Sequence, residues 1–139
     1  MEAKACGRNW LLRIDRGEEV VATLARFCRE KGIRLATVSG LGATDRAAIG
    51  LFRAGAKEYV RREVAGDHEI TSLTGNVSRL AGEVYLHLHA TLSDESFRAI
   101  GGHLDSAVVS GTCELAIVVL EGEAEREFSP EVGLNLFKF

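Results

Sequence analysis

The sequence predicts an α+β domain in which one main helix packs on a largely antiparallel, curled β-sheet. Only one long segment has apolar residues at helical spacing, and nearly every later apolar segment has the length and composition of a strand. The 139 residues, 46% of them hydrophobic, suffice for one core, and no stretch has the composition of a linker. We therefore expect a single domain over residues 1–139, with its core at about 10–137.

The first predicted strand, 10–14, leads through a turn at 15–17 into the helix. Glu18 and Glu19 follow this turn and place negative charge in the first helical turn, where the helix dipole favours it. An apolar stripe at helical spacing comes next and consists of Val20, Leu24, Phe27 and Cys28. Gly32 supplies a capping residue, so the helix is predicted to end there.

Almost all of the remaining chain is predicted to form short strands. Residues 53–56 are expected to make a hairpin connection, and 110–112 a further link. The predicted strands are 35–42, 47–52, 58–64, 70–77, 84–92, 107–109, 114–120, 126–128 and 134–137. One helix cannot cover both faces of so many strands, so the sheet is expected to curl on itself or to be covered by another subunit.

The formal net charge of −3 opposes strong direct binding to nucleic acid, because phosphate contacts require a basic surface. The cysteines, Cys6, Cys28 and Cys113, are odd in number and lack zinc-finger spacing, which favours a reducing compartment. Cys6 lies in an N-terminal stretch that is expected to fray and that has no apolar signal-peptide region. The longest apolar run, 115–120, is too short to span a bilayer. We expect a cytoplasmic protein without membrane association.

Three of the four histidines lie within 17 positions. In the predicted strand 84–92, period-two alternation places His87 and His89 on one face and the leucines on the other. Side chains two residues apart are ~6.6 Å apart along a strand, so both rings can lean toward one ion. His103 can supply a third ligand, because Gly101-Gly102 lets its backbone approach a neighbouring strand. Three imidazoles with an open fourth position suit zinc or another divalent ion.

The sequence leaves other roles open for these residues. The pair His87 and His89 could instead be half-buried polar residues at a subunit interface, hydrogen-bonded to Tyr85, Thr91 or backbone carbonyls. Glu69 is a candidate general base beside a metal-bound water, and equally a surface residue. The carboxylates that could support the metal ligands are Asp94, Glu95 and Asp105. No serine-nucleophile motif and no complete dinucleotide-binding motif is present.

Five segments stand in a characteristic order and spacing: 15–20, 38–43, 86–94, 101–104 and 126–134. Together they resemble the plant and prokaryote conserved (PPC) domain, over roughly 10–137. The resemblance implies a single helix over a largely antiparallel sheet, and assembly as a homotrimer. It also implies that His87, His89 and His103 match histidine positions of the family, at which bacterial members are candidates for a metal site.

The resemblance also implies a role known from plant members, in which the domain stands beside AT-hook motifs that bind the A·T-rich minor groove. In those proteins the domain mediates self-association and contact with other nuclear proteins. Stand-alone prokaryotic members are described as predicted DNA-binding proteins. This chain has no Arg-Gly-Arg-Pro core of an AT-hook. The segment that reads Gly-Arg-Phe-Glu-Ile-Leu in plant members is Gly66-Asp67-His68-Glu69-Ile70-Thr71 here, so its partner-binding role is not carried over.

The sequence therefore predicts a small homotrimeric PPC-domain protein with a histidine-lined divalent-metal site, His87, His89 and His103, and a DNA-associated or regulatory role. The alternative is a metal-dependent enzyme of unknown substrate that uses the same three ligands, with Glu69 as the candidate base. A third hypothesis is an assembly module in which the histidines only fill an interface. DNA is suggested as a partner by the resemblance and is not supported by the charge.

Overall fold

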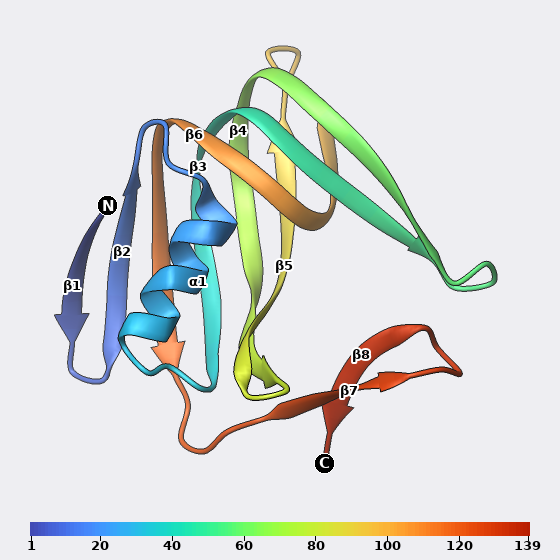
Figure 1. Ribbon diagram of the computed structural model, residues 1–139. Helices are drawn as coiled ribbons and strands as arrows, with labels where there is room; N and C mark the ends of the chain where they lie inside the picture. The colour runs from blue at the N-terminus through green and yellow to red at the C-terminus, as the bar shows by residue number, and fades with distance from the viewer.

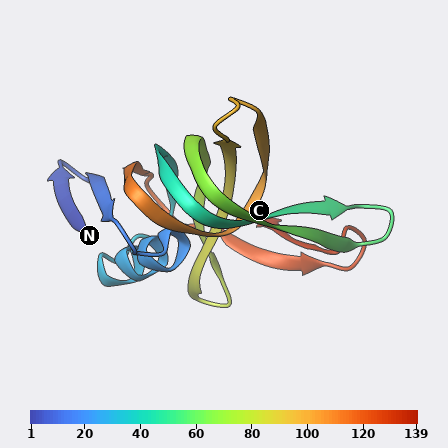
Figure 2. The same ribbon diagram turned by 90° about the horizontal axis from the view of Figure 1, so that it is seen from above.

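The computed structural model describes all residues, 1–139, as one eight-stranded sheet with a single helix, α1 (Val20–Glu30), packed on it (Figures 1 and 2). The strands are β1 (Glu2–Cys6), β2 (Asn9–Asp15), β3 (Ala36–Arg53), β4 (Glu58–Leu80), β5 (Glu83–Ser93), β6 (Ala99–Val119), β7 (Glu125–Ser129) and β8 (Leu134–Lys138). Every strand pairing is antiparallel except that of β4 with β7. The predicted α+β, largely antiparallel architecture is confirmed.

Four strands close into a ring, so the sheet curls on itself, as the sequence predicted. β3 pairs with β4 and β6, and β5 also pairs with β4 and β6. The ring closes at His103 of β6, which pairs with His89 of β5 on one side and with Gly50 of β3 on the other. β1 and β2 extend the sheet beyond β6, and the β7–β8 hairpin extends from β4 (Figure 1).

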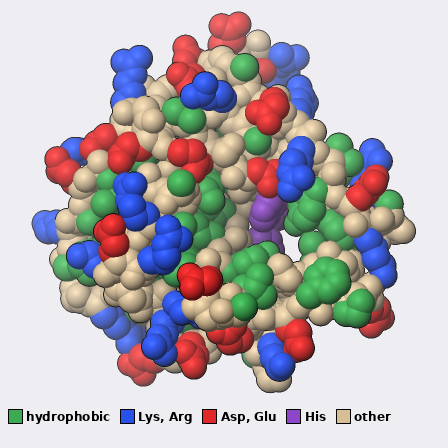
Figure 3. Space-filling model, in the orientation of Figure 1, with side chains coloured by type: hydrophobic (Ala, Val, Ile, Leu, Met, Phe, Trp, Pro, Cys, Tyr) green, Lys and Arg blue, Asp and Glu red, His purple; other side chains and the backbone are tan.

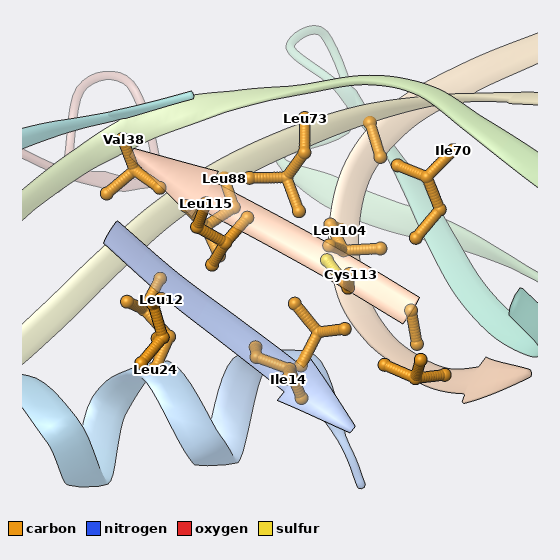
Figure 4. Close-up of a cluster of buried hydrophobic side chains, with 14 of the residues drawn as sticks. Leu12, Ile14, Leu24, Val38, Ile70, Leu73, Leu88, Leu104, Cys113 and Leu115 are labelled. Carbon is orange, nitrogen blue, oxygen red and sulfur yellow. The ribbon is translucent and has the colours of Figure 1, made fainter. Parts of the chain in front are cut away.

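The core is formed by the inward-facing side chains of these strands together with one face of α1. Figure 4 shows residues of β2, β3, β4, β5, β6 and α1 in one cluster: Leu12, Ile14, Leu24, Val38, Ile70, Leu73, Leu88, Leu104, Cys113 and Leu115. Full burial of a side chain such as Leu or Ile stabilises the fold by roughly 1.5–3 kcal/mol. The apolar stripe that predicted the helix is buried against this cluster, as expected.

Glu19 fixes the start of α1. Its carboxylate accepts hydrogen bonds from the backbone N–H groups of Val21, at 3.0 Å, and Ala22, at 2.5 Å. It also accepts one from the backbone of Ala107 in β6, at 3.0 Å, and so joins the helix to the ring. The prediction that Glu18 and Glu19 lie in the first helical turn was wrong, because the Glu19 side chain caps the helix from outside it. α1 has 11 residues, and no helix here has the length and apolar character needed to cross a bilayer.

The N-terminal stretch that was expected to fray forms β1, which pairs with β2 from Glu2 opposite Arg13 to Cys6 opposite Asn9. All of its residues are exposed, so no alternation of apolar and polar side chains marks it in the sequence. The helix therefore follows the second strand of the chain and not the first.

Several strands predicted as separate are continuous. β3 joins the predicted strands 35–42 and 47–52, apart from residue 35, and β4 joins 58–64 and 70–77. β6 joins 107–109 to 114–119 and also includes 99–106, where no strand was predicted. Within β3 the register shifts between Gly40 and Gly42 and again between Thr44 and Arg46. Such bulges bend a strand and increase its twist. The small and polar residues that looked like breaks between strands are therefore the bends that allow long strands to curl into a ring.

Gly102 lies where β6 passes close to β3, and an alanine there should destabilise the fold. A Cβ atom at Gly102 would lie 2.5 Å from the carbonyl oxygen of Gly50, so two backbones would have to separate. We expect Gly102→Ala to lower the free energy of unfolding by ~1–3 kcal/mol, the range typical of overpacking. Urea unfolding followed by circular dichroism measures the change.

The matched control is Gly55→Ala in the β3–β4 hairpin, where an added Cβ meets nothing within 4 Å and φ is not positive. This variant should unfold at nearly the urea concentration of the wild-type protein. Equal midpoints for the two alanine variants would contradict the close approach of β6 and β3.

Candidate metal centre

Two histidines of β5 and one of β6 come together on the face of the ring opposite the core. Leu88 and Ala90 of β5 point into the core and are 1% and 4% exposed. Alternation along the strand therefore turns His87 and His89 to the other face, as the sequence predicted. The pairing of β5 with β6 sets His103 directly beside His89.

The glycine pair Gly101-Gly102 allows β6 to lie this close to its neighbours. A Cβ on Gly101 would be 2.8 Å from the carbonyl oxygen of Ala90 in β5, on the opposite side of β6 from the contact described above for Gly102. Backbones on both sides therefore exclude a side chain at these two positions. The predicted role of the pair, to bring His103 against a neighbouring strand, is confirmed.

The three imidazoles form a compact triangle. Their ring centroids are separated by 5.2 Å for His87 and His89, 5.4 Å for His87 and His103, and 5.6 Å for His89 and His103. One ring nitrogen of each lies within 4.8 Å of the others. Nitrogens bound to one tetrahedral zinc ion are roughly 3.3 Å apart, so small rotations of the side chains suffice to bind it. Histidine side chains are visible in a hollow of the surface in Figure 3.

The surroundings keep two of these rings in the neutral form that binds metals. Burial lowers the pKa of His87, and the positive charge of Arg126 lowers it further. Burial also lowers the pKa of His103, although the carboxylate of Asp105 acts in the opposite direction. Because the ordinary pKa of histidine is ~6.5, rings with a lowered pKa remain neutral at pH 7. Neutral imidazole offers a lone pair to a divalent ion.

One ring nitrogen of the triad has no partner within the protein. The Nδ1 atom of His103 is buried and makes no hydrogen bond. Buried polar atoms are nearly always hydrogen-bonded, and an exception requires an explanation such as a bound ion. An unpaired nitrogen among neutral imidazoles fits a divalent-metal site with three protein ligands and an open position.

His103 has two neighbours that can influence it, Tyr59 of β4 and Asp105 of β6. The Tyr59 ring of β4 lies 5.5 Å from the His103 ring, centroid to centroid. Asp105, one of the carboxylates that the sequence suggested as support, accepts a hydrogen bond from Nε of Arg61 at 3.2 Å. Its charge is therefore shared between His103 and an exposed arginine.

On the far side of the triad, the β7–β8 hairpin supplies a residue that the sequence did not single out. Arg126 donates a hydrogen bond to Oδ1 of Asn76, which pairs with His87 across β4 and β5. The tips of the two hairpins meet where Nζ of Lys57 donates to the carbonyl oxygen of Pro130 at 2.7 Å. Figure 2 shows the β3–β4 and β7–β8 hairpins extending together to one side. An arginine in a short terminal strand gave no signal of this placement.

The structure does not bring the candidate base Glu69 to the histidines. Glu69 pairs with Ser93 of β5, four residues or about 13 Å along the strand from His89. It lines a separate cleft together with Asp67, His68, Asp94 and Glu95. Asp94 is occupied in the β5–β6 turn, where it accepts hydrogen bonds from the backbone of Ser96 and Arg98. Of the acidic residues suggested by the sequence, only Asp105 lies near the triad.

The buried cysteines are unsuited to thiolate chemistry at neutral pH. Burial raises the pKa of Cys28 to about 12 and that of Cys113 to about 11. Both side chains contribute to the core, as the helical spacing predicted for Cys28.

Comparison with known proteins gives one family and several close structures. The Plants and Prokaryotes Conserved (PCC) domain matches residues 1–121. A "putative DNA binding protein" from Bacteroides thetaiotaomicron is 33% identical, with 99% of this chain and 96% of that chain covered and a TM-score of 0.96. A metal-containing protein from Archaeoglobus fulgidus is 39% identical, with 99% and 97% covered and a TM-score of 0.90.

A plant- and prokaryote-conserved (PPC) protein from Pyrococcus horikoshii is 34% identical, with 96% of this chain and 92% of that chain covered and a TM-score of 0.89. No curated protein matches the chain. The domain match spans most of the sequence, and the structural matches span nearly all of it, so the resemblance drawn from the sequence is confirmed. This chain belongs to the Plants and Prokaryotes Conserved (PCC, or PPC) domain family.

Proposed function

We propose that this protein binds one divalent metal ion per chain, with His87, His89 and His103 as its ligands and zinc as the ion best suited to them. The observation that carries the proposal is the gathering of one ring nitrogen from each of the three histidines within 4.8 Å. The buried Nδ1 of His103, which has no hydrogen-bond partner, supports it. The 39% identical structure from Archaeoglobus fulgidus, a metal-containing protein, supports it. Imidazole ligands also bind other divalent transition metals, so ions such as Ni²⁺ and Co²⁺ can occupy the same site.

Metal analysis of protein purified without a histidine tag tests the site. We expect about one divalent ion per chain in the purified protein. After the ion is removed with a chelator, added zinc should bind again at about one ion per chain. Each single variant, His87→Ala, His89→Ala and His103→Ala, should weaken zinc binding by more than the ~10–100-fold loss typical of an outer-shell partner. Isothermal calorimetry on the metal-free protein measures the affinity.

His68→Ala is the matched control, because His68 lies outside the triad and its Nδ1 contacts the carbonyl oxygen of Gly66. This variant should bind zinc as the wild-type protein does. Wild-type protein that neither contains nor takes up a divalent ion would refute the metal site.

A metal-dependent enzyme of unknown substrate is the alternative role of the same residues. Three protein ligands leave an open position, and an ion held in this way lowers the pKa of a bound water to ~7. Glu69 is about 13 Å away along the strand and is an unsuitable base for such a water. The nearby polar groups that could position a substrate are Tyr59, Asp105 and Arg126.

We further propose that the chain assembles as a homotrimer. The helix covers only one face of the sheet, and on the other face Leu11, Leu41 and Val118 are 52%, 56% and 44% exposed. Leu11 and Leu41 line one groove over β1, β2, β3 and β6, in which half of the lining residues are hydrophobic. Apolar surface of this kind on a sheet is normally covered by another subunit.

Multi-angle light scattering should therefore give a mass three times the 15.0 kDa of the chain. Leu41→Glu should shift the protein toward monomer, because a charge buried in an interface without a partner is unfavourable. A wild-type monomer at micromolar concentration would rule out the trimer.

Association with DNA is a second candidate function, and the name of the related structure from Bacteroides thetaiotaomicron favours it. The net charge of −3 limits the electrostatic contribution. A gel-shift assay should therefore show weak binding to A·T-rich duplex at low salt that falls steeply as salt increases. No shift even at the lowest salt would remove DNA as a direct partner.

A further inference from the structure

Arg126 is a buried cation whose surroundings contain no negative charge. The residue is 8% exposed. Its guanidinium donates to Oγ of Ser78 at 2.8 Å, to the carbonyl oxygen of Asn135 at 2.8 Å and to Oδ1 of Asn76 at 2.9 Å. The rings of Tyr85 and Phe137 lie 4.9 Å and 4.1 Å from its central carbon. Every one of these partners is neutral.

An arginine in this position is unusual because buried charges are normally paired. None of the ion pairs in the structure includes Arg126. A guanidinium has five N–H groups, and three of them are donated to the protein. One N–H remains on each terminal nitrogen, and the two can serve an acceptor with two oxygens.

Arg126 lies over the same face of the ring as the histidine triad. Tyr85 and His87 are two residues apart on β5, and alternation directs both to this face. Asn76, which fixes one terminal nitrogen of Arg126, is the register partner of His87.

With a divalent ion bound to the three histidines, the site would carry a large excess of positive charge. Imidazole ligands bring no negative charge to offset a divalent ion, and Arg126 adds a further positive charge. The carboxylate near the triad, Asp105, is already paired with Arg61. An anion bound in the hollow would balance the ion and Arg126 together, and a low local dielectric strengthens both attractions.

We infer that the site takes a small carboxylate, with one carboxyl group held by the two free N–H groups of Arg126 and an oxygen at the open position of the ion. This inference rests on the proposed metal site and adds its ligand class. A carboxylate fits better than a phosphate because its two coplanar oxygens match the planar fork of a guanidinium. Asn76 connects the two parts of the site, since it accepts a hydrogen bond from Arg126 and pairs with His87, so the ligand needs a second oxygen donor to reach the ion.

Cobalt-loaded protein tests the inference, since the visible absorption of bound Co²⁺ reports a new ligand on the ion. Titration with oxalate and with malonate should change this spectrum and give saturable binding, and inorganic phosphate should bind more weakly than either. Arg126→Met should weaken carboxylate binding by at least about tenfold while Co²⁺ affinity stays within about threefold. Arg34→Met, which removes an exposed arginine paired with Glu123, is the matched control and should leave both affinities unchanged.

Arg126→Lys is a second variant in case Arg126→Met fails to fold. It keeps the positive charge and removes the planar pair of N–H donors. It should retain wild-type Co²⁺ affinity and lose carboxylate affinity, with thermal unfolding as the check of integrity. Carboxylate binding that survives in a folded Arg126 variant, or tighter binding of phosphate, would overturn the inference. The uptake of Co²⁺ is measured before any anion is added. If the wild-type protein does not bind Co²⁺, the metal site itself is refuted, which is a different result from failure of carboxylate binding.

Discussion

β6 must pair with β5 at one end and with β3 along most of its length, and this double pairing requires a backbone approach that only glycine permits. The requirement falls on Gly101-Gly102, where added Cβ atoms would collide with carbonyl oxygens of β5 and β3. With these contacts made, the strands β3, β4, β5 and β6 close into a ring and the core lies on its inner side. The next residue, His103, stands at the point of closure and is thereby fixed beside His89.

The two faces of β5 show how one strand serves both stability and chemistry. Its inward side chains, Leu88, Ala90 and Leu92, are in the core, where each contributes apolar burial. Its outward side chains include His87 and His89, which the same backbone holds in fixed register with β4 and β6. A site built on paired strands is more rigid than one built on loops, so the sheet itself holds the three imidazoles close together.

Arg126 links the C-terminal hairpin to this site. β7 pairs with β4 only through Arg79 with Glu125 and Leu80 with Arg126, so backbone pairing alone holds the hairpin weakly. The guanidinium adds hydrogen bonds to β4 and β8 and packs between two aromatic rings, a contact of ~0.5–2 kcal/mol for each ring. The residue that secures the hairpin therefore also contacts Asn76, the register partner of His87, so one side chain links the hairpin to the triad.

The sequence by itself determined the features that depend on local periodicity. Alternation predicted the β5 strand and the shared face of His87 and His89, and helical spacing predicted α1 and the burial of Cys28. The glycine pair before His103 predicted a close approach, because the missing Cβ is a local property with a steric consequence.

Only the tertiary structure decided the rest. β1 has no buried residue, so its pairing with β2 left no apolar pattern to read. Bulges within β3 looked like the ends of strands, since a bulge and a turn use the same small and polar residues. Arg126 and His87 are 39 positions apart, and their proximity follows from ring closure and hairpin docking. Period-two alternation fixes which way a side chain points, whereas register between distant strands fixes what it meets, and that register is set by the packing of the whole core.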